Sequence, residues 1–157
     1  MANKVGGSGA SIGLLTDIDT EARNPVLSTR FGDDQSEYIY LKGVASVGVG
    51  SVVTYDENGL TALIVADAVG PVAVAVAAVV ASTWGWFCIK SPSGGLTTKC
   101  DVVADNTPAY IDGTAGRVDD AAVDGDLIVG MFIRSADASN LCTTQFDHPC
   151  VTNTDVG

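Results

Sequence analysis

Apolar residues recur in short runs through most of the chain, and Gly, Asp, Asn or Pro separate one run from the next. The longest apolar run extends from Val69 to Lys90 and alternates Val with Ala between Val72 and Ala77. Because valine packs well on a pleated surface, we expect a strand here, a turn at Ser82-Thr83 and a return strand over residues 84–90. A hairpin that is apolar on both faces must be covered on both faces, as a central core element or an oligomer seam.

Alternate residues of this hairpin are expected to point to opposite faces of the sheet. The residues assigned to the core or to an oligomer seam are Val72, Val74, Val76, Trp84, Trp86 and Phe87. Two other interpretations are open. A short apolar run also suits a buried helix over residues 71–83. Residues 60–81 are long enough to span a bilayer, although Asp67 and Pro71 interrupt them.

Further strands are expected wherever the period-two pattern returns between turn signals. They lie at residues 38–44, 51–55, 60–65, 96–103, 109–111, 117–118, 127–134 and 141–146. The turns include Asp56 to Gly59, the sequence SPSGG around Gly94, and DGTAG at residues 112–116, while His148-Pro149 is expected to end the last strand. Strands at this spacing predict an all-β protein, a small antiparallel β-barrel or sandwich with an extended N-terminal arm.

The N-terminal arm comprises residues 1–35, which lack the strand pattern of the β domain at 36–150; residues 151–157 form a polar tail. Up to Phe31 the formal charges cancel, so the remainder of the chain carries the whole net charge of −11. A neutral, partly apolar arm on an acidic body suggests that the arm docks on a partner, although a terminus can also be loose and without a role. Candidate binding residues are Ile12, Leu14, Leu15, Ile18, Arg23, Val26, Leu27, Arg30 and Phe31.

The net charge also bears on the choice of partner. A chain with 19 acidic and 8 basic residues is poorly suited to the phosphate backbone of nucleic acids or to anionic membranes. The N-terminus has no apolar segment of the kind found in signal peptides, so we expect synthesis and folding in a cytoplasm. The four cysteines are then expected to be thiols when the chain is made.

Two cysteine spacings suggest disulfides if the protein reaches an oxidising environment. Cys88 and Cys100 lie symmetrically about Gly94, and Cys142 and Cys150 are close in sequence. Sequence alone does not choose among the three pairings that four cysteines allow.

Residues for catalysis or metal binding are sparse. His148 is the single histidine, and the sequence contains no nucleophile elbow with which it could form a catalytic triad. Cys142, His148 and Cys150 cluster, but they lack the close Cys pair of most zinc sites. One acidic loop resembles a calcium ligand set without the EF-hand spacing, and its residues are Asp119, Asp120, Asp124 and Asp126. We expect no catalytic residue, no metal and no cofactor.

Two long segments carry a resemblance to a known family. They are PVAVAVAAVVASTWGWFCIK at 71–90 and AYIDGTAGRVDDAAVDGDLIVGMFIRSA at 109–136, joined by Asp-rich turns and followed by a final strand. Over residues 38–146 this succession resembles the capsid decoration, or cement, proteins of tailed bacteriophages. The resemblance implies a β-fold without catalytic residues, usually a trimer on the outer face of an expanded icosahedral head. There it clamps neighbouring subunits of the major capsid protein.

We therefore expect a structural protein of the virion, located on the outer capsid surface, that binds the coat as a homo-oligomer. The alternative is a virion-borne or secreted module that binds carbohydrate or adheres to surfaces. In that case Trp84 and Trp86 would form a platform for sugar rings on one face of an extended strand.

Overall fold

The computed structural model describes residues 4–7 and 10–153, with side chains described from Gly13 onward. This part of the chain contains strands joined by turns and bends, and no helix. The strands are β1 (Lys4–Gly7), β2 (Ala10–Leu14), β3 (Thr29–Phe31), β4 (Glu37–Lys42), β5 (Val52–Tyr55), β6 (Thr61–Leu63), β7 (Gly70–Ala75), β8 (Trp84–Lys99), β9 (Thr107–Ile111), β10 (Val118–Asp119), β11 (Leu127–Ile133) and β12 (Leu141–Val151).

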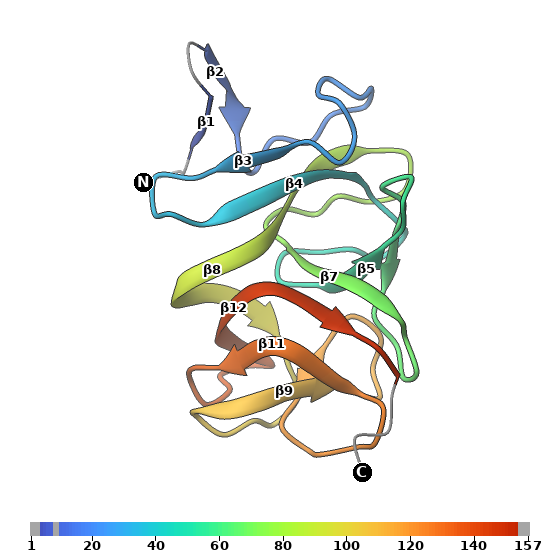
Figure 1. The fold of residues 1–157 in the computed structure, drawn as a ribbon, viewed down its shortest axis with the longest axis vertical. Coiled ribbons are helices and arrows are strands. Elements are labelled where there is room, and N and C mark those ends of the chain that lie inside the picture. The colour runs from blue at the N-terminus through green and yellow to red at the C-terminus, as the bar shows by residue number, and fades with distance from the viewer. Residues whose placement is uncertain (1–3, 8–9, 154–157) are drawn as a thin grey trace.

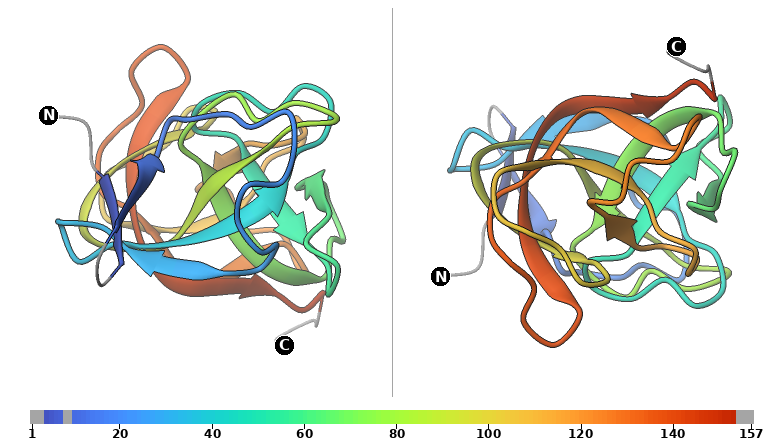
Figure 2. Two further views of the ribbon diagram at one scale, coloured as in Figure 1. Left: turned by 90° about the horizontal axis from the view of Figure 1, so that it is seen from above. Right: turned by 90° about the horizontal axis from the view of Figure 1, so that it is seen from below.

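All these strands belong to one antiparallel sheet with the order β10-β9-β11-β12-β7-β8-β4-β3-β1-β2. β5 and β6 branch from it, because β5 pairs with both β6 and β7. Figure 1 shows the β1–β2 hairpin projecting at one end of the molecule and β9 and β11 at the other. Seen along the long axis, the strands curl around a common interior (Figure 2). The expected all-β antiparallel architecture is confirmed.

The central strands are buried on both faces. β7 and β8 form the expected antiparallel hairpin, with Val74 opposite Cys88, and β4 pairs along the other edge of β8. Trp86 and Cys88 point into the larger core cluster, whereas Phe87 and Ile89 point into a second cluster on the opposite face. The first β-strand of the hairpin ends at Ala75 and a loop follows.

The residues that we assigned to the core or to an oligomer seam contribute to the core of the single chain. Four of them are buried, namely Val72, Val74, Trp86 and Phe87. Val76 and Trp84 are partly buried against the larger cluster. Residues 71–83, for which a buried helix was the rival interpretation, begin in β7 and continue as a loop. Within the described residues no helix is long and apolar enough to cross a bilayer.

The turn at Asp56 to Gly59 is formed as expected. The carboxylate oxygen Oδ1 of Asp56 accepts hydrogen bonds from the backbone N–H groups of Asn58 and Leu60, each at 2.9 Å. Gly59 has a φ of 72°, a conformation that glycine adopts without steric cost. A Cβ atom at this position would also lie within 2.2 Å of Val26 Cγ1, so the N-terminal segment packs directly on this turn.

Two predicted strand ends are wrong. SPSGG does not reverse the chain, because β8 continues as one strand from Trp84 to Lys99. His148-Pro149 does not end the ladder, because β12 continues to Val151. At both places the strand contains a bulge: Thr144 pairs with Leu96 but Phe146 pairs with Ser91, so residues 92–95 bulge out of register. Pro and Gly do mark distorted backbone at these two places, but they are compatible with a bulge as well as with a turn.

The segment from Leu15 to Phe31 packs on the β body. The backbone of Asp19 exchanges two hydrogen bonds with Trp84, both at 2.9 Å. The Tyr40 hydroxyl donates to Asp19 Oδ2 at 2.6 Å and accepts from the backbone N–H of Arg23 at 3.2 Å. β3 then pairs with β4, with Arg30 opposite Tyr38. These contacts hold the residues before β4 in a defined position.

Replacing Trp86 with alanine is expected to lower the free energy of unfolding by about 3–5 kcal/mol, because the substitution empties a fully enclosed site. Trp86 is 2% exposed and its ring lies 5.1 Å from that of Tyr40. Denaturant titration measures the loss. Trp84→Ala is the matched control and should cost less, since Trp84 is only partly buried. Equal losses in the two variants would contradict this assignment.

Replacing Tyr40 with phenylalanine is expected to cost about 1–3 kcal/mol at neutral pH, because the Asp19 carboxylate loses its hydroxyl donor. Burial and then the bond to Asp19 raise the pKa of Tyr40 to about 12. Folding therefore favours the neutral phenol, so this stabilisation is complete below about pH 10 and disappears as pH rises toward 12.

Denaturant titrations at pH 8, 10 and 11 on both proteins measure this dependence. The wild type should lose more stability above pH 10 than Tyr40→Phe does. Tyr55 and Cys88, whose pKa values burial also raises, contribute equally to the alkaline loss in the two proteins. Identical slopes above pH 10 would show that the Tyr40 hydroxyl does not couple to folding.

Candidate functional site

The candidate binding residues of the N-terminal segment differ in how far they are buried. Leu15 is buried in the larger core, and Leu27 packs against the second core cluster. Two others remain well exposed, Ile18 at 44% and Phe31 at 62%. The rest are partly or largely exposed at the surface, namely Leu14, Arg23, Val26 and Arg30. The side chain of Ile12 lies outside the described residues.

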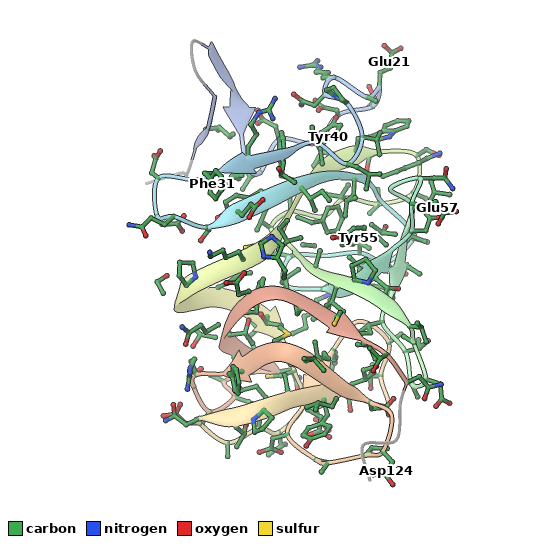
Figure 3. All side chains as sticks on the ribbon, viewed as in Figure 1. Glu21, Phe31, Tyr40, Tyr55, Glu57 and Asp124 are labelled. Atoms are coloured by element: carbon green, nitrogen blue, oxygen red, sulfur yellow. The ribbon has the colours of Figure 1, made fainter. Side chains whose placement is uncertain are left out.

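The two arginines of this segment make local contacts. Arg23 Nε lies 3.4 Å from Asp19 Oδ1, and Arg30 Nη1 donates to the carbonyl oxygen of Thr29 at 2.7 Å. Arg23 contacts the body through its backbone N–H, which donates to the Tyr40 hydroxyl. The exposed apolar side chain at the end of the segment is Phe31, the last residue of β3 (Figure 3).

Phe31 lines a hollow that lies next to a second one. The first hollow, about 450 Å³, is bounded by Phe31, Gly32, Gln35, Lys90 and Pro92. The second, about 230 Å³, shares Lys90 and Pro92 and continues over β11 and β12 along Phe132, Arg134 and Gln145. We call the two together the Phe31–Phe132 groove.

The groove contains both exposed phenylalanines among the four in the chain. Phe31 is 62% exposed and Phe132 is 45% exposed, whereas Phe87 and Phe146 are almost completely buried. Large aromatic side chains left in contact with water in a folded protein often mark an interaction surface, because their burial by a partner is strongly favourable. The groove therefore has the character of a binding surface.

Arg134 is held rigidly at one wall of the groove. Its Nε donates to Gln145 Oε1 at 2.8 Å and its Nη1 donates to Asn106 Oδ1 at 3.0 Å. Its guanidinium lies 5.4 Å from the centre of the Phe132 ring. Among the described residues no carboxylate lies within ion-pair distance of Arg134, so neutral groups orient its positive charge. A pre-oriented guanidinium is well suited to bind a carboxylate.

The bulge in β8 builds this wall. Gln145, which orients Arg134, donates its own Nε2 hydrogen to the carbonyl oxygen of Pro92 at 2.9 Å. Gly94 has a φ of 65°, and a Cβ atom there would lie 3.2 Å from Arg134 Cγ. The residues that the sequence marked as a turn therefore bring the β8 backbone against the Arg134 side chain.

Lys90, which lines both hollows, belongs to a small charged cluster. Lys90 Nζ lies 3.5 Å from Asp147 Oδ2, and His148 lies 2.6 Å from Asp147 and 3.1 Å from Glu37. The hydrogen bond from His148, and to a lesser extent the charge of Lys90, lowers the pKa of Asp147. His148 is about half exposed and has no nucleophilic side chain among these contacts. The cluster joins β4, β8 and β12 at the surface.

The other sequence candidates do not assemble into a site. Trp86 is buried, and the half-buried ring of Trp84 is covered by Lys42 Nζ at 5.3 Å, so a paired tryptophan platform is not formed. In the acidic loop, Asp119 and Asp120 accept hydrogen bonds from backbone N–H groups. Within the described residues no three His, Cys, Asp or Glu side chains form a group that could hold a metal ion.

All four cysteines are free thiols. Cys88 and Cys100 lie within and just after β8, and Cys142 and Cys150 both lie in β12, so each pair suggested by sequence spacing is separated along one extended strand. The structure instead places Cys100 beside Cys142, where their side chains interact.

Sequence reasoning missed Phe132, Arg134, Gln145 and Lys90 as members of one surface. One signal was present for Phe132, because it lies between Met131 and Ile133 in a strand whose alternate residues face the core. An aromatic residue on the outward face of a period-two strand is a candidate for exposure. Lys90 and Gln145 required the register of β8 against β12, and Arg134 required the register of β11 against β12.

No protein-family model, curated protein or solved structure matches this chain.

Proposed function

We propose that this chain is a structural capsid decoration protein, which binds the outer surface of an icosahedral phage head and stabilises contacts between coat subunits. The observation that carries the proposal is the Phe31–Phe132 groove on a strongly acidic all-β body. The sequence resemblance supplies the class of partner, the major capsid protein. The groove supplies a surface through which an otherwise acidic chain can bind another protein.

The composition of the groove suits a protein partner. Its exposed phenylalanines can bury apolar surface, while Arg134 offers a positive charge on a body of net charge −11. Lys90 is paired with Asp147, which also lines the groove. Interfaces concentrate their binding energy in a few aromatic and arginine side chains that water no longer reaches. Phe31, Phe132 and Arg134 are the exposed residues of this type on the groove.

The N-terminal segment contributes to the same surface. Its last exposed side chain, Phe31, forms one end of the groove, and β1 pairs with β3 beside it through Gly6 and Phe31. A single groove of this size would bind the coat weakly. If the protein decorates the head as a trimer, several grooves engage one particle, and the second and third contacts form at high effective concentration.

The first test is a sucrose gradient of the native lysate with mass spectrometry of each fraction. We expect this chain in capsid-sized fractions at high copy number, together with a coat protein. Recovery of the chain only at the top of the gradient, as a free small oligomer, would contradict the decoration role.

The double variant Phe31→Ala/Phe132→Ala is expected to bind the particles at least about tenfold more weakly, since hot-spot aromatics each contribute more than about 1 kcal/mol. Arg134→Ala should also weaken binding to the particles. Binding is measured by co-sedimentation over a range of protein concentrations. Because both phenylalanines are exposed, the fold should survive, and thermal unfolding checks this.

Val102→Ala is the matched control, because Val102 is an apolar residue that is 73% exposed and does not line the groove. Undiminished binding of the double variant would place the coat contact elsewhere on the chain.

A deletion tests the N-terminal hairpin separately. Removing residues 1–31 would also remove Leu15, Asp19 and β3, which are part of the folded body. Removing only residues 1–12 leaves these contacts in place. Reduced binding of this shorter variant, with an unchanged unfolding temperature, would assign coat contacts to the hairpin in addition to the groove.

A further inference from the structure

The cysteine arrangement carries an inference that is independent of the proposed function. Cys100 directly follows the last residue of β8, and Cys142 is the second residue of β12. Leu141 pairs with Lys99 and Cys142 with Thr98, and the backbone N–H of Cys100 donates to the carbonyl oxygen of Asn140 at 3.0 Å. The two cysteines are thus diagonal neighbours across two paired strands.

A second pair on the same two strands shows how close such diagonal neighbours come. Thr98 pairs with Cys142, yet its hydroxyl lies 2.6 Å from that of Thr144, two residues further along β12. Cys100 and Cys142 are related by the same diagonal step. The twist of the sheet therefore brings side-chain tips together along this diagonal, and both cysteines point into the larger core cluster.

We propose that Cys100 and Cys142 form an intramolecular disulfide when the protein meets an oxidant, and that Cys88 and Cys150 stay as thiols. The two intrastrand pairings are excluded by distance, because the seven residues of strand between Cys142 and Cys150 span on the order of 20 Å. A disulfide requires Cα atoms within about 7 Å of each other.

The reaction needs a named acceptor for two electrons, and oxidised glutathione serves. One cysteine thiolate attacks the glutathione disulfide and releases one glutathione thiolate. The second cysteine then displaces the other glutathione. Two S–H bonds are lost, one S–S bond forms, and the two electrons and two protons end on two glutathione thiols.

Burial controls the rate of this reaction. Cys100 and Cys142 are 0% and 3% exposed, and burial raises the pKa of both thiols, so the reactive thiolate is scarce in the closed fold. The turn that precedes β12 offers a route for opening, since Ser139 and Asn140 are both exposed to solvent. Oxidation should therefore proceed through local opening at this end of β12 and accelerate in mild urea.

The bond would close the chain from Cys100 to Cys142 into a loop that contains β9, β10 and β11. A loop of this length restricts the unfolded chain strongly. The oxidised protein should unfold at a temperature about 10 °C higher than the reduced protein.

The test is peptide mapping by mass spectrometry under non-reducing conditions. The full chain is incubated with oxidised glutathione or with dithiothreitol, with and without mild urea, and free thiols are then alkylated. We expect titratable thiols to fall from four to two and a single cross-linked species joining Cys100 to Cys142. Four alkylated cysteines after oxidation in urea, or a Cys88–Cys100 or Cys142–Cys150 cross-link, would overturn the proposal.

Two variants separate the bond from other effects of oxidation. Cys150→Ser retains the proposed pair and should show the same rise in unfolding temperature. Cys142→Ser removes one member of the pair and should show no rise. If Cys142→Ser does not fold, the peptide map of the wild type still decides the pairing. An equal rise in both variants would attribute the stabilisation to something other than the Cys100–Cys142 bond.

Discussion

The structure depends on covering both faces of its central strands. β4, β7 and β8 present apolar side chains on either side, so neither face can be left to water. The sheet meets this requirement by curling, which places Trp86 and Cys88 in one core cluster and Phe87 and Ile89 in another. The remaining strands and the N-terminal segment are arranged around these two clusters. Ala73 and Ala75 contribute small buried side chains to the second cluster.

Curling a single sheet requires its long strands to bend, and the bends are also the features that create the groove. β8 bends at residues 92–95 and β12 bends near His148, and in each case strand pairing resumes beyond the bulge. The β8 bulge fixes Gln145, which in turn orients Arg134 beside Phe132. The bulges that let the sheet curl around the core thus also produce a rigid, partly aromatic surface. This surface is the part of the acidic body best suited to contact another protein.

The N-terminal segment links the core to that surface. Asp19 and Tyr40 join the segment to the central strands at a buried position, and β3 continues it along the edge of β4. Phe31 is held at the end of the groove because the residues before it are anchored. In the proposed decoration role this matters, since a pre-positioned aromatic side chain loses less conformational entropy on binding than one in a loose arm.

The amino-acid sequence by itself determined the fold class, the central hairpin with its two-sided burial, and the turn at Asp56 to Gly59, because these follow from local periodicity and turn chemistry. It could not distinguish a turn from a bulge at SPSGG or at His148-Pro149, since Gly and Pro satisfy either one and only the partner strand decides. For the same reason it could not place Arg134 against Gln145, or Cys100 against Cys142. Those contacts depend on the register between strands far apart in the chain, and only the tertiary structure sets that register.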